Sequence, residues 1–146
     1  MSDIQNEINQ KPEARLNLQG ESEMILREAV AFALAEALVF CTLNQVDPAV
    51  MLEAISAGAA GSWQISNLGP QIIQRDFSPG FKVGLQRKDL HLAIDAADSV
   101  NMPLLGTALV DRMFAVAEGI HGSDAGTQAL VTALEQLTNV EVKSSS

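Results

Sequence analysis

The stretch GFKVGLQRKDLHLAIDAADSV, residues 80–100, carries polar side chains in its first half that could bind a ligand. On a helical wheel, Lys82, Gln86 and Asp89 share one sector, which Ala93 occupies further along. No basic residue stands three or four positions from Asp89, so no neighbour on the helix neutralises its carboxylate. The pattern predicts a cleft beside the start of this helix. The alternative is that its first two turns extend over the surface.

The opposite side of the same helix carries charged residues at helical spacing. Arg87, His91, Asp95 and Asp98 fall together there, which predicts a solvated face. His91 and His121 are the only histidines, and no cysteine is near either of them. A zinc site is therefore not expected.

Helices must position these residues, because the sequence is rich in Ala and Leu and contains no convincing strand. The predicted fold class is all-α, a compact helical domain with a long apolar first helix at about 22–45. From Ala29 to Leu43 the only charge in that helix is Glu36. A helix that is apolar on nearly every side must be covered all round. We therefore expect a homodimer formed through the helix at 22–45.

Turn and cap residues divide the rest of the chain. Asp47 is a natural N-cap for a second helix, and Asp124 for a last helix that runs to about Leu137. The dipeptide Gly69-Pro70 predicts a break between two short helical pieces. The domain limits follow from composition: a flexible polar arm at 1–20, a helical domain at 21–140 and a frayed tail at 141–146.

Charge and cysteine content exclude several partners. The formal net charge is −9, from 18 acidic and 9 basic residues, so neither nucleic acid nor an anionic membrane is an expected partner. Cys41 is the single cysteine and lies in an apolar run, which indicates a buried thiol in a reducing compartment. The longest apolar run has about fifteen residues, too few to cross a bilayer, and no signal peptide is visible. A cytoplasmic protein is expected.

Six short motifs occur in a familiar order between Ala35 and Leu137: AEAL, VDP, SAGAAGSW, RDFSPGF, KDLHLAIDAA and MPLLGTA. Together they resemble the C-terminal domain of the β-hydroxyacid dehydrogenases, which include 3-hydroxyisobutyrate dehydrogenase and tartronate semialdehyde reductase. The resemblance implies a helical domain whose long first helix connects it to a nucleotide-binding domain. It also implies that this domain closes one side of the active site and builds most of the oligomer interface.

The resemblance assigns roles to particular residues. Lys88 matches the lysine that approaches the NAD(P) cofactor, while Phe81 and Asp89 match residues of the substrate pocket. Ser62 and Trp63, in the GSW motif, lie near the same cleft in family members. For Trp63, an ordinary place in the core is an equally good interpretation.

The sequence also departs from the family. It contains no G-x-G-x-x-G turn between a strand and a helix, and no acidic ribose-binding residue after one. Counted back without gaps from AEAL, the family's catalytic lysine and its companion asparagine fall on Gly20 and Met24. We therefore expect no catalytic residue in this chain, and no bound cofactor in the isolated chain.

These observations leave three hypotheses. The first is a stand-alone domain that is inactive alone and acts in binding or assembly. The second is one half of a split or truncated oxidoreductase, which transfers hydride between NAD(P)H and a small hydroxy acid or semialdehyde when joined to a separate Rossmann-domain chain. The third is an engineered or excised domain, made for structural work.

Overall fold

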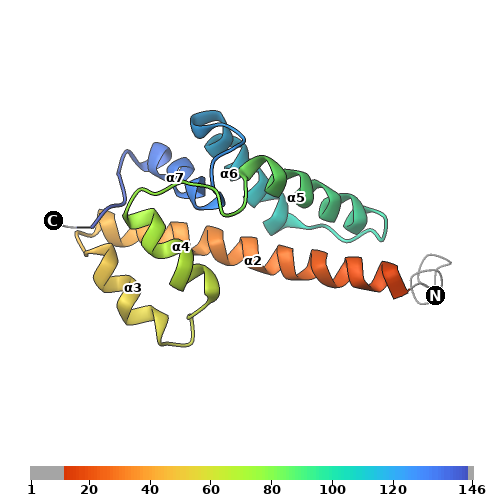
Figure 1. The fold of residues 1–146 in the computed structure, drawn as a ribbon, viewed down its shortest axis with the longest axis horizontal. Helices are drawn as coiled ribbons and strands as arrows, with labels where there is room; N and C mark the ends of the chain where they lie inside the picture. Colours follow the sequence, from red (N-terminus) through yellow and green to blue (C-terminus); the bar gives the residue numbers. More distant parts are fainter. Residues whose placement is uncertain (1–11, 145–146) are drawn as a thin grey trace.

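The structure is a computed structural model, which describes residues 12–144 and, within residues 12–17, the backbone alone. The described residues form helices and no named strand, so the all-α prediction is confirmed. One helix, α2, runs along the length of the molecule, and the others pack beside it (Figure 1). The elements are α2 Pro12–Leu43, α3 Pro48–Ser56, α4 Trp63–Ile73, α5 Val83–Asp98, α6 Leu105–His121, the 3-10 helix η1 Thr127–Leu130 and α7 Val131–Thr138.

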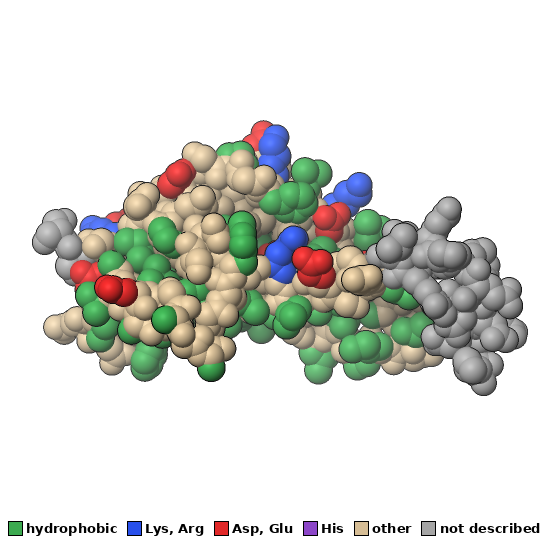
Figure 2. All heavy atoms as spheres, turned by 60° about the horizontal axis from the view of Figure 1, so that its bottom comes forward, with side chains coloured by type: hydrophobic (Ala, Val, Ile, Leu, Met, Phe, Trp, Pro, Cys, Tyr) green, Lys and Arg blue, Asp and Glu red, His purple; other side chains and the backbone are tan. Residues whose placement is uncertain are grey.

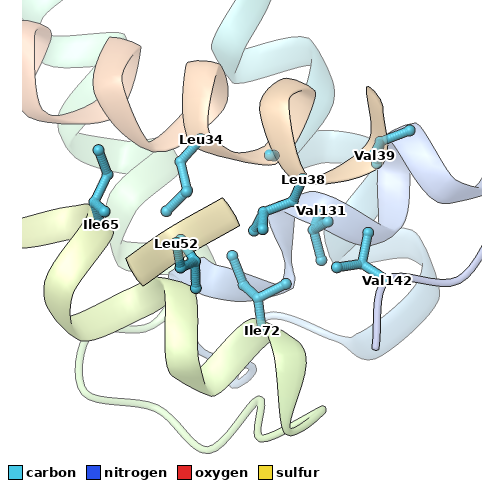
Figure 3. Close-up of a cluster of buried hydrophobic side chains, with 9 residues drawn as sticks. Leu34, Leu38, Val39, Leu52, Ile65, Ile72, Val131 and Val142 are labelled. Atoms are coloured by element: carbon cyan, nitrogen blue, oxygen red, sulfur yellow. The ribbon is translucent and has the colours of Figure 1, made fainter. Parts of the chain in front are cut away.

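Helix α2 is apolar on several sides because it supplies two separate cores. Its C-terminal half places Leu34 and Leu38 against α3, α4 and α7, in the cluster drawn in Figure 3. Its N-terminal half places Met24 in a second cluster with Leu90 of α5 and Phe114 of α6. Much of the apolar surface of this helix is therefore covered by other helices of the same chain.

Helix α2 also begins earlier than expected. It starts at Pro12, so residues 12–20 of the expected arm are helical, and the prediction of a flexible arm at 1–20 is wrong for that part. The rest of the arm, residues 1–11, lies outside the described residues.

The expected break at Gly69-Pro70 is absent, since α4 continues through both residues. Pro70 lacks an N–H and so loses one helical hydrogen bond. Tertiary packing offsets that loss. A Cβ at Gly69 would lie 2.8 Å from both methyl carbons of Leu52, so the absence of a side chain lets α3 approach α4 closely.

Capping follows the sequence at α3 but not at the last helix. Asp47 accepts a hydrogen bond from the Ala49 N–H at 2.8 Å, as an N-cap should. Asp124 does not cap α7. Its carboxylate accepts a hydrogen bond from Lys82 Nζ at 2.8 Å, and η1 intervenes before α7 begins.

The expected frayed tail is anchored at one residue. Val142 is fully buried, and its N–H donates to Glu135 Oε1 at 2.7 Å. The same oxygen accepts from Arg75 Nη1 at 2.5 Å. The prediction of a frayed tail at 141–146 is therefore wrong at Val142; residues 145–146 lie outside the described residues.

Shortening this anchor should destabilise the fold. Val142→Ala removes buried methyl groups from the first core and should lower the free energy of unfolding by about 1–2 kcal/mol. Lys143→Ala is the control: its side chain is exposed, and it should change stability by less than about 0.5 kcal/mol. Urea unfolding measures both. Equal effects of the two substitutions would contradict the anchoring of the tail.

Candidate functional site

A cavity of about 360 Å³ opens between α2, α4 and the start of α5; we call it the Trp63 hollow. Trp63 and Phe81 supply exposed aromatic surface there, with exposed fractions of 63% and 39%. Arg27, Glu28 and Gln86 line the same cavity. The structure therefore brings together two of the residues predicted from the sequence, Trp63 and Phe81. Trp63 is not an ordinary core residue.

Local hydrogen bonds fix these two aromatic residues. The Ser62 hydroxyl accepts from the Ile65 N–H at 3.2 Å, which makes Ser62 the N-cap and Trp63 the first residue of α4. Ser62 itself does not line the hollow. The carbonyl of Phe81 accepts from the Thr127 N–H at 3.1 Å, so the turn before α5 is held by η1.

Gln128 holds the other side of the same turn. Its side-chain Nε2 donates to the backbone carbonyls of Asp76 and Ser78, each at 2.9 Å. A Cβ at Gly126 would lie 2.4 Å from Gln128 Oε1, so glycine is needed for this close approach. The RDFSPGF motif is thus a loop clamped from within the domain, and it presents Phe81 at the mouth of the hollow.

A charged side chain lies almost buried at the wall of the Trp63 hollow. Glu28 is 4% exposed, and its Oε1 accepts from Arg27 Nε at 3.0 Å. Arg27 Nη2 also donates to Gln86 Oε1 at 3.4 Å. Burial raises the pKa of the Glu28 carboxyl, while the hydrogen bond from Arg27 and its charge act in the opposite direction.

The sequence interpretation missed Glu28, although a signal was present. Met24, Glu28, Ala31 and Ala35 recur at spacings of four and three, which places Glu28 on the buried stripe of α2. The same interpretation did select Gln86 as polar and facing a cleft. It is fully buried and lines the hollow, so that prediction agrees with the structure.

Asp89 lies in a second hollow of about 540 Å³, which we call the Asp89 groove. Glu21, Glu23 and Gly20 line it too, and Arg27 is shared with the Trp63 hollow. Among the described residues no partner hydrogen-bonds or pairs with the Asp89 carboxylate, as the sequence predicted. A side chain would fit at Gly20, because a Cβ there would meet no atom within 4 Å.

Lys88 and Lys82 do not join these residues. Lys88 is exposed and lines neither hollow, so its predicted role toward a cofactor stays a prediction. Lys82 lies just before α5 and pairs with Asp124. Of the three polar residues predicted to face a cleft, Gln86 and Asp89 therefore line a hollow, and Lys82 does not.

The predicted solvated face of α5 is partly covered by α6. Arg87 forms ion pairs with Asp111 and Glu118, and its side chain is 24% exposed. His91 Nε2 lies 3.1 Å from Asp111 Oδ2. These charges link the two helices instead of facing solvent freely. Among the His, Cys, Asp and Glu side chains that the structure describes, no group of three is placed to hold a metal ion.

The relatives described below have a longer chain than this protein. The family model described as "NAD-binding of NADP-dependent 3-hydroxyisobutyrate dehydrogenase" matches residues 24–134. The chain is 41% identical over 112 residues to a probable 3-hydroxyisobutyrate dehydrogenase-like protein from Arabidopsis thaliana, which covers 77% of this chain and 34% of the relative. It is 36% identical over 107 residues to the 2-hydroxy-3-oxopropionate reductase of Escherichia coli, with 73% and 37% covered. The chain thus spans about a third of the length of these relatives.

The fold has counterparts among solved structures. A 3-hydroxyisobutyrate dehydrogenase from Salmonella typhimurium superposes with a TM-score of 0.74 at 23% identity, over 79% of this chain and 40% of that one. The match agrees with the helical architecture described above. In the part of the chain that the structure describes, no helix meets the length and apolarity needed to span a membrane. With the family model matching most of its length, the chain belongs to the 3-hydroxyisobutyrate dehydrogenase family, whose helical C-terminal domain it resembles.

Proposed function

We propose that this chain acts in binding and assembly: it provides one wall of a small-molecule site and a surface for self-association, and it does not transfer hydride by itself. The observation that carries the proposal is the pair of hollows that meet at Arg27. One presents Trp63 and Phe81, and the other presents Asp89. Three of the residues implied by the family resemblance therefore line adjoining hollows.

The Asp89 groove supplies no suitable proton donor for a carbonyl. Family members place a lysine at the position of Gly20, whereas the groove here contains the carboxylates Glu21, Glu23 and Asp89. Among the described residues that line the groove, Arg27 is the only cation. A guanidinium keeps its proton at neutral pH and makes a poor general acid. These residues support ligand binding better than acid–base catalysis.

The NAD(P) cofactor of the family has one fitting residue here. Lys88 is exposed and forms no ion pair with residues 18–144, so its ammonium is available to an anionic or nicotinamide-bearing ligand. When bound, the cofactor would supply the hydride. The pyrophosphate needs a glycine-rich turn at a helix N-terminus, and the described helices contain none after a strand.

Isolated protein should bind NADPH weakly. Lys88 is the one described residue assigned to the cofactor, and the described residues form no pyrophosphate site. We therefore expect a dissociation constant above about 1 mM in a calorimetric titration. Binding at micromolar NADPH would contradict the proposal. In that case Lys88→Ala tests the role of Lys88, with Lys143→Ala as the exposed control, and unchanged affinity would remove Lys88 from the site.

Self-association is supported by apolar side chains that α2 leaves exposed. Leu26 and Phe40 are 68% and 70% exposed, and Leu43 is 52% exposed. Figure 2 shows the face that includes one side of α2 and α3. Hydrophobic side chains are spread over this face, and charged side chains are few. Two cores within the chain do not cover these side chains. A second copy of the chain, bound along α2, would cover them.

The homodimer should be visible in solution. Sedimentation at about 10 μM should give a dimer, and Phe40→Asp should give a monomer, because a charge in a buried interface is costly. Leu137→Asp is the matched control: Leu137 is 73% exposed on α7 and should leave the dimer intact. A wild-type monomer at this concentration would exclude the proposed interface.

The second candidate function is the helical half of an oxidoreductase, completed by a separate nucleotide-binding domain. A lysine side chain would have room at Gly20, next to the unpaired Asp89. This open space favours the second function. In this function the assembled pair would reduce a small semialdehyde or oxidise a small hydroxy acid with NAD(P).

Mixing experiments separate the two functions. The protein is combined with the nucleotide-binding domain of the Escherichia coli reductase, NADPH and its 2-hydroxy-3-oxopropionate substrate, and absorbance at 340 nm is followed. We expect no turnover from the wild type, and turnover at least about 100-fold above background from Gly20→Lys, since general acid–base catalysis contributes that much. Gly106→Lys, at an exposed glycine with equal space, is the control. Turnover by the wild-type mixture would favour the second function.

A further inference from the structure

Two buried polar atoms at the Trp63 hollow have no partner. Arg27 binds one oxygen of Glu28 and the side-chain oxygen of Gln86. Glu28 Oε2 and Gln86 Nε2 are then left buried and without a hydrogen bond to any described residue. The two residues are 4% and 0% exposed, and both line the cavity.

This arrangement is costly for a fold that needs only packing at this position. An unsatisfied buried donor or acceptor loses the free energy of its hydration and gains nothing in return, so native proteins keep few of them. Here one acceptor and one donor come from α2 and α5 and lie at one cavity. Both side chains line this cavity and their terminal torsions are soft, so rotation about those torsions can bring each unpaired atom to a ligand there.

We propose that Glu28 and Gln86 make the Trp63 hollow a site for an uncharged primary amide attached to a flat apolar body. The amide oxygen accepts from Gln86 Nε2, and the amide N–H donates to Glu28 Oε2. A carboxylate of the same shape has no proton to donate and brings its charge against the Glu28 carboxylate. Trp63 and Phe81 provide the aromatic walls for the flat body. The inference rests on the proposed role of this hollow in binding.

Benzamide and benzoate test the inference, because they share size and shape and differ in the group that meets Glu28 and Gln86. Trp63 is the only tryptophan of the chain, so its fluorescence reports binding at the hollow. At pH 7 we expect benzamide to bind with a dissociation constant of about 1–10 mM, as suits a fragment of this size. Benzoate should bind at least about tenfold more weakly.

Two variants test whether Glu28 and Gln86 cause the preference for benzamide over benzoate. Glu28→Gln keeps the shape and supplies a donor, so benzoate should bind to it nearly as well as benzamide. Gln86→Leu should weaken benzamide about tenfold. Gln136→Leu, at an exposed glutamine of α7, is the control and should change neither. Thermal unfolding of Gln86→Leu should occur at the wild-type temperature or above it, since the substitution removes an unsatisfied donor.

The possible failures are distinct. Equal affinity of the wild type for the two probes, or benzamide binding that Gln86→Leu leaves unchanged, would overturn the amide preference and leave the hollow as a binding site. No fluorescence change with either probe at 50 mM would overturn both the preference and the proposed binding role of the hollow.

Discussion

The structure depends on one constraint: a single helix must serve two cores. Over 32 residues α2 extends about 48 Å, longer than any one of its partner helices. Leu34 and Leu38 pack on α3, α4 and α7, whereas Met24 packs on α5 and α6. Between these cores lies Glu28, at the point where the apolar stripe of α2 passes the Trp63 hollow. The site occupies the gap that two cores on one helix leave between them.

Arg27 connects the chemistry of the two hollows. It binds Glu28 and Gln86 on one side and lines the groove of Asp89 on the other. Among the described residues that line the Asp89 groove, this one cation lies beside the carboxylates of Glu21, Glu23 and Asp89, so the local charge is negative. The described wall therefore differs in character from a lysine-based active site, although Trp63, Phe81 and Asp89 line its two hollows.

The sequence predicted the features that depend on periodicity and on motif order. Gln86 and Asp89 face hollows because helical spacing fixes their side relative to Leu90. What sequence reasoning missed depends on contacts distant in the chain. Arg87 was predicted to face solvent, but α6, which follows later in the chain, supplies Asp111 as its partner. Likewise, Pro70 marks a helix break by local rules, and only Leu52 packed on Gly69 shows why α4 continues.

The burial of Val142 has a consequence for how the chain folds during synthesis. The first core joins Leu34 and Leu38 to Val142, more than a hundred residues later. The ribosome adds roughly 5–20 residues each second, so the contact of Val142 with this face of α2 can form only several seconds after α2 emerges. Contacts so distant along the chain also slow folding compared with a bundle of neighbouring helices. The nascent α2 thus exposes apolar side chains that α7 and Val142 are the last to cover.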